Sequence, residues 1–467
     1  MAPAPRRGLT VFSCSYKTTI STDIEIMKSK SKFILAVALV AAGLSAAAQA
    51  QTEINITGAT AFRQASNRSI IAGYGGLASV GIVHSNSAAT QASAESASAI
   101  SFRGNWPGIG DTIIRARWSG STEGIRDVAL QNDIFVYPDA DIPAAGTITA
   151  RNENSNPVNA NVARKPKFSF SDVQQTSSAF RTPVLNPADS RVGVVTFTML
   201  KNEGAQGANL TNITQQAWRA ILGNAQGTAF LDLFTGNAAD ANTRVFVTGR
   251  NDGSGTRAAY LIETGFGVSR PVKQWKQGVD GFNGVVGPGA TGDVLNTLQF
   301  WPNPDAADPN NNSVQWGNSL TGNNGYFSGA NVRDLMKLQT TSVTTVGPTG
   351  SATLAPNPKS LVLITWLSTA DALNAMGGGA IPLSYNGVGI TPIAASPGLS
   401  VADLYKVTDG QYTAWTYQRL YFIGSLTANE NTVYTGIVAA IPANLGSSGV
   451  ALASMNVSRG NDGDPVQ

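Results

Sequence analysis

The chain alternates short apolar runs with segments whose apolar residues recur at helical spacing. In the stretch 52–58, Ile54 and Ile56 lie on one face of an extended strand. The run that starts at Val192 is apolar almost without interruption, which is typical of a strand buried on both faces of a parallel sheet. Further strands are predicted over 111–120, 166–172, 243–250 and 359–368, and a helix over 212–223. This alternation predicts an α/β protein with mostly parallel sheets.

Three of the predicted helices follow a strand and a turn of small polar residues. They lie in "INITGATAFRQAS" (54–66), "RWSGSTEGIRDVA" (117–129) and "VTGRNDGSGTRAAYLIE" (247–263). The first N–H groups of a helix have no backbone partner and carry a partial positive charge, while glycine allows a ligand to approach closely. Any one of these turns could be an ordinary helix cap. Three such turns in one chain, the third of them beginning at Arg250, predict a binding site for phosphate or sulfate.

The sequence from Met27 has the features of a secretory signal. Three lysines precede an apolar run from Phe33 to Leu44, and Ala48-Gln49-Ala50 matches the small-residue cleavage pattern. We therefore expect a signal peptide over 27–50, cleaved after Ala50, and a periplasmic or secreted protein. Residues 1–26 are then expected to be an extension from a misassigned start, with a genuine N-terminal extension as the alternative.

The composition changes once this leader is set aside. The leader holds six of the 32 basic and two of the 29 acidic residues, so the mature chain carries 26 basic and 27 acidic residues. A formal charge of −1 offers no argument for binding nucleic acid. The single cysteine, Cys14, also lies in the leader, so the mature chain has no thiol for a disulfide or a metal. We expect no cofactor and no membrane insertion after cleavage.

Several segments resemble one family. "RNDGSGTR" (250–257) resembles the R-S-D-G-S-G-T signature of the periplasmic phosphate-binding proteins of ABC transporters. "GSTEGI" (120–125) resembles the G-S-S-G-G turn of that family, "ITGATAF" (56–62) its N-terminal T-G-A-G-A-T-F segment, and "FSFSDV" (168–173) its F-G-A-S-D-A segment. Looser similarities over 209–224 and 403–422 keep the same order along the chain.

The resemblance implies a periplasmic-binding-protein fold of type II, in which two α/β lobes with mostly parallel sheets enclose a ligand cleft. The first lobe would comprise 51–190 and 400–467, and the second 191–399. The implied function is capture of inorganic phosphate for an ABC-type importer by a monomer without catalytic residues, with the ABC permease as partner.

The resemblance also implies which residues bind the ligand. Arg250 would make a bidentate contact, and Asp252 would support it. Asp172 would accept a hydrogen bond from the protonated oxygen of phosphate and would repel sulfate, which has no proton to donate. The implied phosphate-binding residues are Thr60, Ala61, Phe62, Ser121, Asp172, Arg250, Ser254, Gly255 and Thr256.

The chain departs from the family pattern and leaves alternatives open. Glu123 occupies a glycine position of the family turn, so it could point outward or weaken anion binding. A similar protein at the cell surface could bind another oxyanion, or act in adhesion or a matrix, without any transporter. An esterase or phosphatase is disfavoured because His84 is the only histidine and no G-x-S-x-G motif is present. Five aromatic residues in the last quarter of the sequence could form a platform on which sugars stack, or they could pack in the core: Trp366, Tyr412, Trp415, Tyr417 and Tyr421.

Overall fold

The computed structural model describes most of the chain beyond residue 50. The described residues are 51–153, 157–204, 207–224, 227–270, 272–277, 297–300, 325–340, 345–347, 360–396 and 398–467. Residues 51–467 form one compact unit. The predicted extension 1–26 and the predicted signal peptide 27–50 lie outside the described residues, as does the segment 301–324. Within the described part, no helix is both long and apolar enough to cross a membrane.

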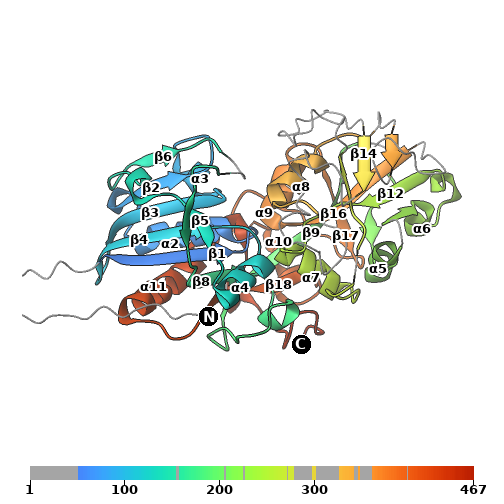
Figure 1. The fold of residues 1–467 in the computed structure, drawn as a ribbon. Coiled ribbons are helices and arrows are strands. Elements are labelled where there is room, and N and C mark those ends of the chain that lie inside the picture. Colours follow the sequence, from blue (N-terminus) through green and yellow to red (C-terminus); the bar gives the residue numbers. More distant parts are fainter. Residues whose placement is uncertain are drawn as a thin grey trace, which may run out of the picture. The chain divides into compact units, whose positions relative to one another are not determined.

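A large mixed sheet forms the centre of this unit (Figure 1). Within the described residues its strands follow one another in space as β11 (Thr228–Phe230), β12 (Thr243–Val247), β16 (Ser360–Ser368), β9 (Arg191–Lys201), β18 (Trp415–Phe422), β8 (Phe168–Ser171), β1 (Thr52–Gly58), β4 (Gly110–Arg117), β3 (Ala99–Trp106), β2 (Val80–His84) and β6 (Ile148–Ala150). Strand β17 (Ile381–Tyr385) pairs with both β9 and β10 (Asn212–Ile213). Two small sheets comprise β13 (Trp275–Gln277), β14 (Thr297–Phe300) and β15 (Thr345–Gly347), and β5 (Ile134–Val136) with β7 (Val162–Arg164).

Helices connect and flank these strands. They are α2 (Arg63–Gly73), α3 (Gln91–Glu95), α4 (Ser121–Leu130), α5 (Gln215–Gly223), α6 (Asp232–Thr235), α7 (Gly255–Glu263), α8 (Gly329–Met336), α9 (Thr369–Met376), α10 (Val401–Thr408) and α11 (Ala428–Asn444). The C-terminal helix α11 begins with a capping box formed by Thr427 and Glu430, and it packs against α2 near the start of the chain. The α/β class predicted from the sequence is confirmed, and so are the three strand–turn–helix segments, which are β1–α2, β4–α4 and β12–α7.

The direction of β9 differs from the prediction. Its apolar run predicted a parallel strand, but β9 runs antiparallel to β16, β17 and β18. All of its residues from Val192 to Lys201 are buried, because the strand lies in the middle of the sheet. A continuous apolar run therefore indicates burial on both faces, and it does not determine which way the neighbouring strands run.

Strands β9 and β18 join the early and the middle parts of the chain. The first half of β9 pairs with β18, and its second half pairs with β16 and β17. Strand β18 in turn pairs with β8 through Arg419 to Phe422. Strands β9 and β18 thus lie between β8 and β1 on one side and β16, β12 and β11 on the other (Figure 1). The lobe boundaries drawn from the sequence remain a prediction.

The aromatic residues singled out in the sequence belong to the core. Trp366, Tyr412, Trp415, Tyr417 and Tyr421 are all buried. The indole of Trp366 contacts the rings of Phe197, Trp218, Tyr260 and Tyr385. These contacts favour core packing over a platform for sugar stacking.

His84 and the segment 138–166 are part of the fold. His84 is buried in β2, where its Nδ1 accepts a hydrogen bond from the Asn86 N–H, and burial lowers its pKa to about 4. The neutral imidazole is therefore a structural element of the strand. The segment 138–166 is rich in Asn, Ala and Pro, which is typical of a surface insertion, yet it contributes β6, which pairs with β2, and β7, which pairs with β5.

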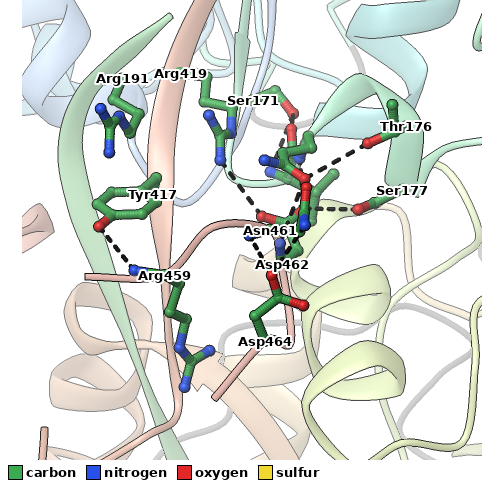
Figure 2. A network of polar contacts seen from close by, with 12 residues as sticks. Ser171, Thr176, Ser177, Arg191, Tyr417, Arg419, Arg459, Asn461, Asp462 and Asp464 are labelled. Atoms are coloured by element: carbon green, nitrogen blue, oxygen red, sulfur yellow. Dashed lines mark hydrogen bonds and ion pairs between the residues drawn. The ribbon is translucent and has the colours of Figure 1, made fainter. Parts of the chain in front are cut away.

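The C-terminal residues close a polar network between distant elements (Figure 2). Asp462 accepts a hydrogen bond from the Ser177 hydroxyl at 2.8 Å and pairs with Arg419 at 3.7 Å. Arg459 pairs with Glu263, the last residue of α7, at 2.9 Å. The tail therefore ties the turn that follows β8 to the C-terminal end of α7. Both elements carry residues of the candidate site.

Candidate functional site

The first two strand–turn–helix junctions lie side by side. Strands β1 and β4 are parallel neighbours, with Thr57 opposite Arg117, so their carboxyl ends meet at the same edge of the sheet. The Gly120 N–H donates to the Gly58 carbonyl at 2.9 Å. Helices α2 and α4 consequently begin next to each other, as parallel pairing requires.

The third junction contacts the second. The Glu123 N–H donates to the Gly253 carbonyl at 3.1 Å. Gly120 has φ +144°, and a Cβ at this position would lie 2.4 Å from the Gly253 oxygen. Glycine is therefore required where the turn before α4 meets the turn before α7.

Ser121 and Asp172 form a buried pair beneath these turns. The Ser121 hydroxyl donates to the Asp172 carboxylate, and the Asp172 N–H donates to Ser121 Oγ at 3.2 Å. Both residues are only 1% exposed. Burial raises the pKa of Asp172 to about 6, against the opposing effects of the Ser121 hydrogen bond and the Arg250 charge. The sequence separates these two residues widely, but the neighbouring strands β8, β1 and β4 bring them together.

Arg250 joins the third junction to the first. Its Nη1 donates to the Thr60 hydroxyl at 2.8 Å, while Nε and Nη2 donate to the carbonyls of Tyr326 and Phe327 at 3.1 and 2.7 Å. The residue is 1% exposed. Burial lowers its pKa to about 10, and the charges of Asp371 and Asp172 act in the opposite direction. The guanidinium is therefore a buried cation at neutral pH.

The remaining predicted residues surround this centre. Ser254 caps α7, its hydroxyl accepting from the Arg257 N–H at 3.4 Å, and Gly255 and Thr256 form the first turn of that helix. Among the described residues, none provides a hydrogen-bond acceptor for the N–H groups of Thr60, Ala61 and Phe62. The side chain of Phe62 itself packs in the core against Phe170.

The supporting role predicted for Asp252 stays a prediction. The Asp252 carboxylate acts electrostatically on Arg257 and on Glu123. The described hydrogen bonds of Arg250 go to Thr60, Tyr326 and Phe327. The electrostatic partners of Arg250 are Asp371, Asp172, Arg63 and Glu123.

Glu123 faces the site and does not point outward. Its side chain is 12% exposed and pairs with Arg126 at 3.2 Å. Burial, assisted by the nearby Asp127, raises its pKa to about 7, and its charge reaches Arg250. A carboxyl group that is largely protonated at slightly acidic pH opposes an anion less than an ionised one.

Two further helices, α8 and α9, reach the same centre, although neither belongs to the three predicted strand–turn–helix segments. Asp371 lies in the first turn of α9 and acts electrostatically on Arg250. A Cβ on Gly329, at the start of α8, would lie 2.1 Å from Asp371 Oδ2 and 3.7 Å from Arg250 Nη1. The segment "LSTADAL" (367–373) joins β16 to α9 and repeats the pattern of a strand, small polar residues and a helix. This pattern is the sequence signal that could have predicted Asp371 as a site residue.

The close contact at Gly255 leads to a prediction about stability. A Cβ on Gly255 would lie 1.5 Å from Asp172 Oδ1 and 2.4 Å from Ser121 Oγ. We expect Gly255→Ala to lower the free energy of unfolding in urea by about 1–3 kcal/mol through overpacking, although alanine is the better helix former. Gly223→Ala is the matched control, because a Cβ there meets only Phe266 at 3.6 Å. Equal stability of the two variants would show that α7 does not press on Asp172.

Comparison with known proteins gives only distant matches. No protein-family model matches the chain, and no curated protein matches it. Among solved structures, an ABC-type phosphate transport receptor from Vibrio cholerae is 10% identical, with a TM-score of 0.37, over 83% of this chain and 93% of that one. PstS from Borrelia burgdorferi is also 10% identical, with a TM-score of 0.31, over 84% of this chain and 92% of that one. Likenesses this weak do not assign the chain to a family, so its ligand has to be inferred from its own residues.

Proposed function

We propose that this protein captures inorganic phosphate outside the cytoplasm and delivers it to an ABC-type importer. The observation that carries the proposal is the convergence of three helix N-termini on two buried charged groups, Arg250 and Asp172. Arg250 contacts Thr60 before α2, and Ser121 of α4 and Gly255 of α7 both lie against Asp172. Free amides, hydroxyls and a guanidinium at one place are the groups that bind a tetrahedral oxyanion.

Each group has a distinct role in this proposal. The N–H groups at the start of α2, α4 and α7 donate to the anion oxygens, together with the hydroxyls of Ser121, Ser254 and Thr256. Arg250 provides the positive charge. Asp172 accepts the proton of hydrogen phosphate, which gives the site a means to reject sulfate.

Capture follows from how the site is divided between two parts of the chain. Thr60 and Ser121 belong to the proposed lobe 51–190 with 400–467, and Arg250 and Gly255 to the proposed lobe 191–399. An anion that contacts both sets of residues favours the closed arrangement of the lobes over the open one. The proposed protein is a monomer that releases phosphate to an ABC permease and carries out no reaction.

Phosphate binding by residues 51–467 tests the proposal directly. We expect equilibrium dialysis with radiolabelled phosphate to give a dissociation constant in the micromolar range or below, with sulfate a poor competitor. Retention of no phosphate at millimolar concentration would contradict the proposal. Tight binding of sulfate in place of phosphate would favour a receptor for another oxyanion. The transport role predicts that deletion of the encoding gene lowers phosphate uptake by cells.

A further inference from the structure

Arg63 is a buried arginine to which none of the described residues gives a hydrogen bond or a direct ion pair. It is the first residue of α2 and is 9% exposed. Its Nη1 is fully buried and makes no hydrogen bond, and no carboxylate of the described residues forms an ion pair with it. Arginine stays protonated in proteins, so an uncompensated guanidinium inside the molecule is strongly unfavourable. The start of a helix adds to this cost, because the N-terminal end of the macrodipole is also positive.

Two other arginines of the described residues show how the fold can place a carboxylate against a guanidinium. Arg115, whose side chain is fully buried, pairs with Glu53 at 2.9 Å and with Asp139. On the same helix as Arg63, Arg68 pairs with Glu95 at 2.6 Å. A carboxylate thus contacts the fully buried Arg115, whereas no carboxylate of the described residues contacts Arg63.

Arg63 also lies within the candidate site. Its charge acts on Arg250, and burial is the main factor that lowers its pKa. The carboxylate of Asp371 acts on Arg63, on Arg250 and on Arg333. Because Arg333 has its own partner in Asp334 at 2.8 Å, Asp371 is shared between Arg63 and Arg250. Arg250 also has the charges of Asp172 and Glu123, whereas Asp371 is the one carboxylate of the described residues that acts on Arg63.

We propose that Arg63 is a second guanidinium ligand of the anion that binds at this site. Three independent features point to the same place: the unpartnered Arg63 head group, the free N–H groups of Thr60, Ala61 and Phe62, and Arg250. The bound tetrahedral oxyanion supplies the direct hydrogen-bonding and ionic partner that the described residues do not give the Arg63 head group. This inference rests on the proposed phosphate site and adds a residue that the family resemblance does not assign.

Two measurements on one variant test the inference. We expect Arg63→Gln to weaken inorganic phosphate binding at least about tenfold by isothermal titration calorimetry, because a charge-assisted contact is lost. The same variant should unfold at a higher temperature than the wild type when no phosphate is present, because an unpaired buried charge has been removed. Arg63→Lys should bind phosphate with intermediate affinity, since it keeps the charge without the planar fork.

The control variant is Arg68→Gln on the same helix, which should leave phosphate affinity unchanged. Equal affinity of the wild type and Arg63→Gln would overturn the inference while leaving the phosphate site intact. A lower unfolding temperature of phosphate-free Arg63→Gln would also overturn it, because Arg63 would then be structural. Failure of the wild type to bind phosphate contradicts the proposed function, and the unfolding temperature still decides whether Arg63 is an uncompensated cation.

Discussion

Replacement of Arg250 by alanine is expected to abolish phosphate binding. Arg250 is a buried cation that contacts Thr60 and lies in electrostatic reach of Asp172, so its charge is directed into the proposed site. Loss of one partner of a buried, charge-assisted contact typically costs about 3–5 kcal/mol, which corresponds to a roughly 100- to several-thousand-fold loss of affinity. Isothermal titration with inorganic phosphate would measure this loss.

A loss of binding through misfolding has to be separated from a loss of the contact. Arg250→Ala leaves the carbonyls of Tyr326 and Phe327 without their donor, so the variant will also be less stable. Arg250→Lys keeps a positive charge and should stay folded by circular dichroism, yet bind phosphate far more weakly because the bidentate fork is gone. Arg270→Ala, at an exposed arginine after α7, is the control. A folded Arg250→Ala protein with near wild-type affinity would exclude Arg250 from the site.

The centre of the site could be predicted because its signals are local. Each junction is a strand, a glycine-containing polar turn and a helix, and each is readable within about fifteen residues of sequence. Parallel pairing of β1 with β4 then places two of the junctions together without further information. The Arg250 turn joins them through the contacts of Gly253 with Glu123 and of Arg250 with Thr60.

The periphery of the site could not be predicted in the same way. Tyr326 and Phe327, which hold the Arg250 guanidinium, contribute only backbone carbonyls, and these leave no trace in the sequence. The lack of a partner for Arg63 depends on every element packed around it, so no spacing rule reveals it. The direction of β9 was missed for a related reason, since an apolar run reports burial but not pairing.

Ionisation of Glu123 and ionisation of Asp172 have different effects on anion affinity. Glu123 has a pKa raised to about 7, and its charge acts on Arg250, so its ionisation weakens the binding of any anion. Asp172 lies among Ser121, Arg250 and Asp462 and would touch the bound anion itself. Hydrogen phosphate and sulfate are both dianions, so the ratio of their affinities, with phosphate counted as its dianion, cancels the effect of Glu123 and leaves the effect of Asp172.

Discrimination between phosphate and sulfate should therefore collapse as the pH falls through about 6, the raised pKa of Asp172. Above this pH the ionised carboxylate accepts the proton of hydrogen phosphate and repels sulfate. Below it the protonated carboxyl group donates to either anion. Sulfate affinity should fall up to about tenfold for each pH unit above 6, because only the protonated form accepts sulfate. Competition of sulfate with radiolabelled phosphate between pH 5 and pH 8 would measure this change.

Asp172→Asn should bind sulfate at every pH in that range, because its amide replaces the protonated carboxyl group. Its ratio of phosphate affinity to sulfate affinity at pH 8 is expected to fall by about 100-fold or more, the scale set by an unpaired buried charge.

The ligand-free Asp172→Asn variant should also be more stable than the wild type at neutral pH. The raised pKa of Asp172 stabilises the folded state below the unfolded pKa, and this contribution is lost as the pH rises through about 6. Asp189→Asn, at an exposed carboxylate whose pKa Arg191 lowers to about 2, is the control. It should leave the phosphate-to-sulfate ratio unchanged, and at neutral pH it should lower stability slightly and not raise it, because a lowered pKa stabilises the folded state above the unfolded pKa. A sulfate affinity of the wild type that stays constant from pH 5 to pH 8 would remove Asp172 from the site.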